Sequence, residues 1–162
     1  MKKKTLIVWT TVAALGLLLA LPAVSAAFTA QRIVIPYTVT TDKWWSGLAI
    51  HNESDSAETY SVSFYAEDGT FIAGDCVTVQ PRAMVRDALP AFASDPEMID
   101  GAASVYIRTT GASDDTFSAT LFVGNTAESQ GFAFQSYRSE DYEAFAIILC
   151  DIILPILPGG GS

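Results

Sequence analysis

Polar and apolar side chains alternate along most of the chain that follows residue 27. In residues 58–64 the apolar side chains of Tyr60, Val62 and Phe64 alternate with serine and threonine. A period of two is that of a β-strand with one face on a core and the other in water. Similar runs, two of them less regular, predict further strands at residues 33–39, 47–52, 71–79, 83–89, 103–109, 116–123 and 131–137.

Turn-forming residues separate these runs. Asp68 and Gly69 predict a tight hairpin, because this dipeptide accepts the positive φ angles that such a turn requires. Residues 91–101 predict a longer loop with one helical turn after Ser94 or Asp95, and Gly74 indicates a bulge within its strand. We therefore expect an all-β protein, an antiparallel β-sandwich of seven to nine short strands, with a closed barrel as the second choice.

The first 26 residues predict a signal peptide. A basic start (Lys2 to Lys4) leads into the apolar residues 5–24, and small residues stand at Val24 and Ala26, the −3 and −1 positions of a cleavage site. An uncleaved membrane anchor is the alternative. The location that follows from cleavage near Ala26 is secreted or periplasmic.

The C-terminal segment differs from the rest of the chain. Residues 144–154 are nearly all apolar, interrupted by Cys150 and Asp151, and a Pro- and Gly-rich stretch follows. The segment is too short to span a bilayer, and its isoleucines favour a strand buried on both faces. Self-association through a strand donated to another subunit is an alternative, and contact with lipid is a third. We divide the chain into a signal peptide (1–26), a β-sandwich domain (27–138) and an apolar strand with its tail (139–162).

Charge excludes one class of function. The sequence carries 18 acidic and 9 basic residues, and three of the basic residues belong to the predicted signal peptide. A basic surface for phosphate backbones is therefore missing, and we expect no nucleic acid partner.

The sequence contains few residues that could form a catalytic site. His51 is the single histidine, and no Gly-x-Ser-x-Gly elbow accompanies it, so a nucleophile–base pair is not indicated. Paired carboxylates are numerous, but a short sandwich leaves little chain to build a deep cleft. We expect no enzyme and no catalytic residue, with a small secreted hydrolase as the last of the alternatives.

Acidic loops carry hard oxygen ligands that suit calcium, although none follows the EF-hand spacing. Adjacent carboxylates usually belong to exposed turns, so we expect no cofactor and no metal site, with one structural calcium as the alternative. The candidate ligands are Glu53 with Asp55, Asp95 with Glu97 and Asp100, and Asp114 with Asp115.

Cys76 and Cys150 are the only two cysteines. An even count in an exported chain favours a disulfide, which would attach the apolar segment to the strand that contains Cys76. Two separate buried thiols are the alternative. No CxxC pair is present, so the predicted bond is structural.

Trp44 and Trp45 form the most unusual local pair. Neighbouring residues on a strand point to opposite faces, so at most one tryptophan can enter the core. The other is a candidate ligand-binding residue that could stack on a sugar, a peptide or a subunit. The plainer interpretation places one in the core and the other beneath a loop or the tail. Asn52 also begins a glycosylation sequon with Glu53 and Ser54, a pattern that often arises by chance.

Three stretches together resemble a loose group of secreted bacterial β-sandwich modules. They are IPY at residues 35–37, WWSGLAIHN at 44–52 and VSFYAEDG at 62–69, followed by a Pro-centred turn at 80–82 and by GFAF at 131–134. The resemblance covers roughly residues 33–136 at the level of pattern and implies export and an immunoglobulin-like sandwich. It implies no activity and no catalytic residues.

The sequence thus favours a non-catalytic exported module with a structural or interaction role at the bacterial envelope or outside the cell. Its partner would be a protein or a polysaccharide. A carbohydrate-binding module that uses Trp44 or Trp45 is the main alternative.

Overall fold

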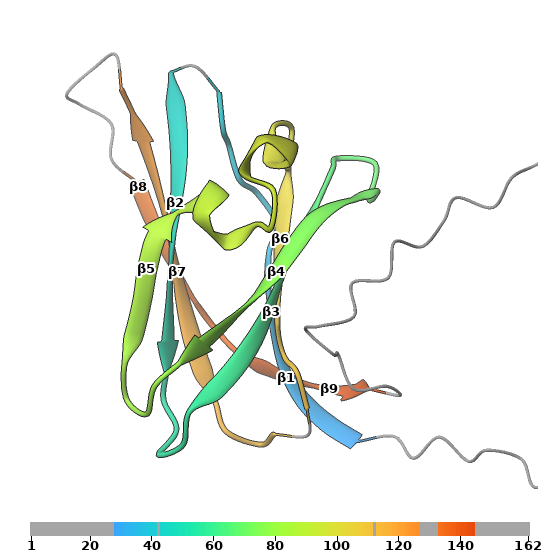
Figure 1. The fold of residues 1–162 in the computed structure, drawn as a ribbon, viewed down its shortest axis with the longest axis vertical. Helices are drawn as coiled ribbons and strands as arrows, with labels where there is room; N and C mark the ends of the chain where they lie inside the picture. Colours follow the sequence, from blue (N-terminus) through green and yellow to red (C-terminus); the bar gives the residue numbers. More distant parts are fainter. Residues whose placement is uncertain (1–27, 42, 112, 127–132, 145–162) are drawn as a thin grey trace, which may run out of the picture.

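Two antiparallel sheets pack face to face in a computed structural model of the chain (Figure 1). The structure describes residues 28–41, 43–111, 113–126 and 133–144. Sheet A has the strand order β4-β3-β6-β1-β9, and sheet B has the order β5-β2-β7-β8. The predicted antiparallel β-sandwich is confirmed. The predicted signal peptide and most of the apolar C-terminal segment lie outside the described residues.

Nine strands and two short 3-10 helices make up the described part of the chain. Sheet A contains β1 (Phe28–Ile35), β3 (Glu58–Tyr65), β4 (Phe71–Val79), β6 (Ser104–Thr109) and β9 (Glu140–Ala144). Sheet B contains β2 (Trp44–Asn52), β5 (Met84–Ala88), β7 (Phe117–Asn125) and β8 (Ala133–Arg138). The helical turns are η1 (Leu89–Phe92) and η2 (Pro96–Ile99).

The core lies between the two sheets and follows the predicted alternation. Tyr60, Val62 and Phe64 of β3 are all buried, and the ring of Tyr60 packs 4.7 Å from that of Phe117 on β7. Burial of such apolar surface is the main force that holds two sheets together. Among the described residues, no helix is long and apolar enough to cross a membrane.

The predicted hairpin after β3 is confirmed. Gly69 has a φ of 84°, and the Asp68 carboxylate accepts a hydrogen bond of 2.8 Å from the backbone N–H of Thr70. That bond holds the pKa of Asp68 below its usual value.

Some expected boundaries and irregularities were wrong. β1 begins at Phe28 and ends at Ile35, whereas the pattern predicted residues 33–39. The bulge between β3 and β4 falls where Tyr65 pairs with Phe71, so Gly74 is not the bulged residue. A Cβ at Gly74 would lie 2.7 Å from a backbone oxygen of β3, which explains the glycine. The helical turn after Asp95 is confirmed as η2, but η1 was not predicted.

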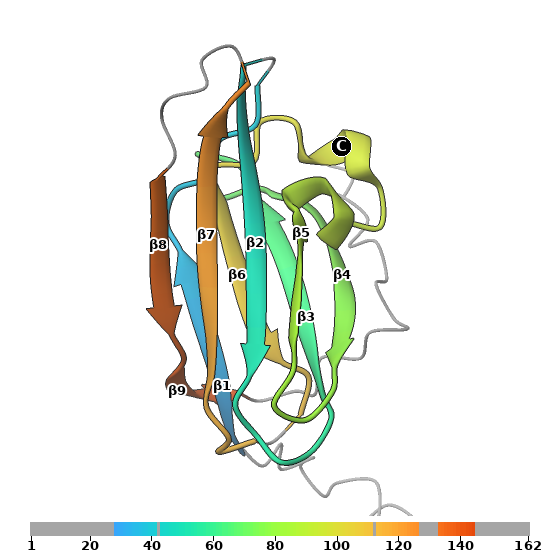
Figure 2. The same ribbon diagram turned by 90° about the vertical axis from the view of Figure 1, so that its left-hand side faces the viewer.

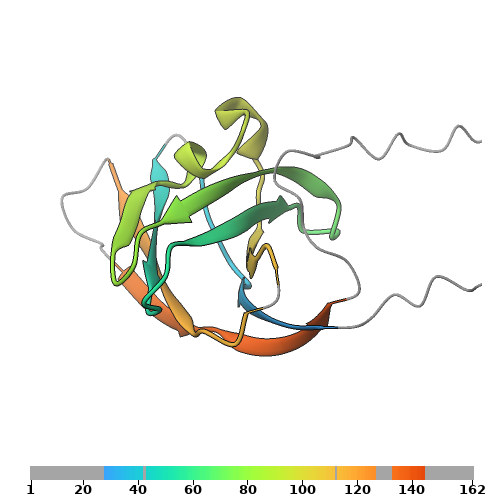
Figure 3. The same cartoon turned by 60° about the horizontal axis from the view of Figure 1, so that its bottom comes forward.

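The chain changes sheets at Ser139, between β8 and β9. The backbone N–H of Ser139 donates to the Phe117 carbonyl at 2.9 Å, and its hydroxyl accepts from the Phe117 N–H at 2.9 Å. β8 therefore stays on sheet B, while β9 pairs with β1 on sheet A (Figure 3). The sequence pattern did not predict β9, whose residues Glu140, Asp141 and Glu143 are charged. One side of the sandwich is closed by this crossing.

Candidate binding surface

Trp44 and Trp45 begin β2, and both are partly exposed, at 40% and 38% of their surface. They point to opposite sides of the strand, as alternation requires. Trp45 shares its side with Ala49 and lies on the outer face of sheet B, whereas Trp44 lies beyond the end of the core. The interpretation that placed one tryptophan in the core was wrong. The core side chains of β2 are Leu48 and Ile50, and the two tryptophans at the start of the strand lie outside the core.

Two glycines hold the indole of Trp45 against the sheet. Trp45 pairs directly with Gly124 of β7, and a Cβ at Gly124 would lie 2.5 Å from the indole ring. A Cβ at Gly47 would lie 3.2 Å from the same ring. The indole therefore occupies space that only the absence of two side chains leaves open. The ring covers the glycines and stays partly exposed.

Two phenylalanines continue the aromatic surface across sheet B. Gly47, Phe122 and Phe134 lie in one cross-strand row over β2, β7 and β8, so Phe122 and Phe134 are direct neighbours. Trp45 is the diagonal neighbour of Phe122, a position that aromatic side chains can bridge. Phe134 is 70% exposed. We call Trp45, Phe122 and Phe134 the aromatic strip; Figure 2 shows the three strands side by side.

Hydroxyl groups border the aromatic strip. In the next row, the hydroxyls of Thr120 and Ser136 lie 3.1 Å apart and are exposed. A strip of aromatic side chains beside hydrogen-bonding groups can contact a flat ligand and orient it. It can equally receive the apolar side chains of a protein partner.

Trp44 lines a separate hollow at the end of the sandwich. This hollow has a volume of about 430 Å³ and is also lined by Thr40, Thr41, Lys43 and Asp100. Thr41 orders the turn, because its hydroxyl accepts a 3.1 Å hydrogen bond from the backbone N–H of Trp44. The two tryptophans that are adjacent in sequence therefore face different surfaces.

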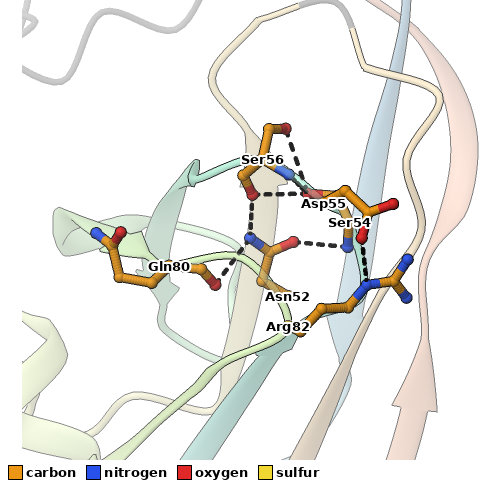
Figure 4. Close-up of polar contacts among 6 residues, drawn as sticks. All are labelled: Asn52, Ser54, Asp55, Ser56, Gln80 and Arg82. Atoms are coloured by element: carbon orange, nitrogen blue, oxygen red, sulfur yellow. Dashed lines mark hydrogen bonds and ion pairs between the residues drawn. The ribbon is translucent and has the colours of Figure 1, made fainter.

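At the opposite end of β2, the side chain of Asn52 forms a set of buried hydrogen bonds that we call the clamp. Asn52 is fully buried, and its side-chain N–H groups donate to the carbonyls of Ser56 and Gln80 at 2.7 and 3.2 Å (Figure 4). They also donate to the Val79 carbonyl at 3.0 Å. Its side-chain oxygen accepts a 2.9 Å bond from the N–H of Ser54. The amide joins the loop after β2 to the end of β4. Because this nitrogen is buried and engaged, the sequon at Asn52 is not a glycosylation site of the folded protein.

Ion pairs surround this clamp. Arg82 adopts a φ of 54° and pairs with Asp55 at 2.8 Å, which lowers the pKa of Asp55 (Figure 4). Burial alone raises the pKa of Glu53, but hydrogen bonds from Ser118, Thr116 and Arg138 outweigh burial and hold that pKa below its usual value. Arg138 lies 2.8 Å from the Glu53 carboxylate.

These contacts account for several residues that the sequence offered as metal ligands. Glu53 and Asp55 are engaged with arginines, and Asp95 accepts a 3.1 Å bond from the N–H of Glu97 at the start of η2. Within the described ranges, no group of three or more His, Cys, Asp or Glu residues is placed to hold a metal ion. His51 lies on β2, opposite Ser118 and Met84.

Only one of the two cysteines of the predicted disulfide lies within the described residues. Cys76 lies on β4, where it pairs with Ser61 of β3. Cys150 lies outside the described residues, so the bond stays a prediction.

Sequence reasoning missed Phe122 and Phe134. The signal was present, because each is an aromatic residue in the polar phase of its strand. Phe122 follows the outward-facing Ser118 and Thr120, and Phe134 precedes Ser136 and Arg138 on the same face. An aromatic side chain in phase with polar neighbours points away from the core.

No protein-family model, curated protein or solved structure matches this chain. The resemblance to secreted bacterial modules therefore stays a prediction.

Proposed function

We propose that this chain is a non-catalytic exported β-sandwich module that binds a partner at the bacterial envelope or outside the cell. The aromatic strip is the observation that supports this role. Exposed aromatic side chains in a row are costly to leave in water, and they are enriched where proteins bind other molecules.

The rigidity of the aromatic strip strengthens the proposal. All three side chains stand on hydrogen-bonded neighbouring strands, and the glycines beneath Trp45 define where its ring lies. A surface that is ordered before binding loses less conformational entropy when a partner docks. A rigid sheet is therefore a suitable support for recognition.

Binding to isolated bacterial cell envelopes, measured by co-sedimentation, tests the role. Phe134→Ala should lower the affinity about tenfold or more, as expected for an exposed aromatic side chain that a partner buries. Met84→Ala is the matched control, because Met84 is exposed on the outer face of sheet B but outside the aromatic strip. Equal affinities for the parent chain and both variants would contradict the proposal.

A carbohydrate is the second candidate ligand, and the exposed indole of Trp45 favours it. The flat indole at one end of the aromatic strip suits the apolar face of a sugar ring, and the hydroxyls of Thr120 and Ser136, beyond Phe122, can form hydrogen bonds with further hydroxyl groups of an extended saccharide. Trp45→Ala should then abolish binding to purified polysaccharide, whereas Trp44→Ala, on the other side of β2, should not. Protease treatment of the envelopes separates the candidates, because it removes a protein partner and leaves a polysaccharide in place.

Export and the disulfide belong to the same proposal. Cleavage after Ala26 would give a mature chain that begins at Ala27, which mass spectrometry of the exported protein can measure. A cross-linked peptide containing Cys76 and Cys150 in a non-reducing digest would establish the bond. Intact Met1 in a membrane fraction would instead support the uncleaved anchor.

A further inference from the structure

The register of sheet A determines where the side chain of Cys76 points. Cys76 pairs with Ser61, Ser61 with Arg108, Arg108 with Arg32, and Arg32 with Glu140. Residues in one cross-strand row share a face of the sheet. The neighbouring row contains the core residues Val62, Ile107 and Ile33, so the row of Cys76 lies on the outer face, away from sheet B.

That outer face is more shielded than the outer face of sheet B. Tyr106 packs 4.9 Å from Tyr65 and carries Arg108 over its ring at 4.9 Å. Ser61 and Ser63 face outward but are each only 8% exposed. The outer face of sheet A beside Cys76 therefore carries small, little-exposed side chains and is bordered on one side by aromatic rings.

The described chain ends at the opposite edge of sheet A. Ala144 pairs with Phe28, four residues along β1 from the row that contains Arg32. Four strand spacings separate β9 from β4. At about 3.3 Å per residue and about 4.8 Å per strand, the Cα atoms of Ala144 and Cys76 are roughly 23 Å apart.

The remaining chain is barely long enough to make the connection. The six peptide steps from Ala144 to Cys150 reach at most about 20–22 Å, and a disulfide bridges a further 4.4–6.8 Å or so between Cα atoms. A bond within one molecule therefore requires residues 145–149 to run almost straight. A path around the end of the sandwich is longer than this reach. The shortest path crosses the outer face of sheet A, on the side to which Cys76 points.

We propose that the outer face of sheet A is the docking surface for residues 145–154 of the same molecule, held there by a Cys76–Cys150 disulfide. The inference rests on the disulfide proposed above and names the surface that the bond implies. It also provides a cover within the molecule for apolar residues that would otherwise face water.

A length series of the exported full chain tests the reach. Deletion of residues 147 and 148 keeps the alternation of the segment but shortens its reach by about 7 Å, so the bond within one molecule should be lost. Insertion of two glycines at the same place should leave the bond intact. Non-reducing peptide mapping of the monomer measures both. A bond between two molecules in the parent chain, or an intramolecular bond in the deletion variant, would overturn the proposal.

Arginine modification by phenylglyoxal tests docking separately from the bond. Arg108 lies in the cross-strand row of Cys76, so it should be protected in the full chain and should lose that protection in a chain that ends at Ala144. Arg86 is exposed on β5 of sheet B and serves as the internal control, with equal modification in both chains. A mapped disulfide with no difference at Arg108 would show that the bond forms without docking and would overturn the docking surface.

Discussion

The two ends of β2 show opposite uses of a strand terminus. At the start, Trp44 and Trp45 are large apolar side chains, and both remain partly exposed. At the end, Asn52 is polar and fully buried, with its amide bonded to three backbone carbonyls. Hydrophobicity alone would assign the tryptophans to the core and the asparagine to the surface. The arrangement is reversed because neighbouring loops surround Asn52, whereas glycines and an open hollow border the tryptophans.

The difference separates stability from recognition on a single strand. A buried amide that satisfies several backbone groups stabilises the fold and offers nothing to a ligand. An exposed ring contributes less to stability and leaves surface for a partner. A substitution at Asn52 should therefore mainly lower the free energy of unfolding, whereas a substitution at the tryptophans should mainly weaken binding.

Asn52→Ala should give the largest loss of stability. Removing the amide leaves the Ser54 N–H and the carbonyls of Val79 and Gln80 without a side-chain partner, so we expect the free energy of unfolding to fall by about 3 kcal/mol. Urea denaturation measures the change. Gln135→Ala on the exposed β8 is the control and should have little effect. A stability equal to that of the parent chain would mean that the clamp is not needed.

Gly124→Ala should be the next most damaging, because the new Cβ would lie 2.5 Å from the Trp45 indole. Displacing the ring should cost about 1–3 kcal/mol and should also weaken envelope binding. Adding Trp45→Ala removes the clash, so the double variant should recover part of the stability. Purely additive losses would contradict direct contact between the ring and the glycine.

Glu53→Gln should have a smaller and pH-dependent effect. The pKa of Glu53 is lowered in the folded protein, so its stabilisation is complete above the unfolded pKa of about 4.3 and is lost as the pH falls through the lowered folded pKa. We expect a loss of about 1 kcal/mol at pH 7 that shrinks toward zero in acid. Thermal melts across this pH range measure it. A difference that stays constant with pH would rule out the carboxylate as its cause.

Phe134→Ala should change stability least, within about 0.5 kcal/mol, because the side chain is 70% exposed. Its effect on envelope binding should nevertheless be the largest of these variants. Loss of stability without loss of binding would place Phe134 with the structural residues and remove the contrast between the aromatic strip and the clamp at Asn52.

Most of the fold could be predicted from the sequence because its signals are local. The alternation in residues 58–64 and the Asp68–Gly69 turn each require only a few neighbouring residues. β9 could not be predicted in this way, because the partner that makes Glu140–Ala144 a strand is β1, more than a hundred residues earlier. One of the three residues of the aromatic strip was predicted: Trp45 was identified, whereas Phe122 and Phe134 join it only through the pairing of β2, β7 and β8.

The sequence by itself determined the all-β class, most strand positions and the choice of tryptophans as candidate contacts, since each depends on local alternation and turn chemistry. Tertiary structure decided which polar group is buried and which aromatic groups lie together. Asn52 is buried because the carbonyls of Val79 and Gln80, from the distant end of β4, converge on its amide. Trp45 lies against the sheet because Gly124 pairs with it across the strands and leaves room for its ring. Strand register brings residues from distant parts of the chain into contact, and hydrophobic alternation within one strand contains no information about its partner.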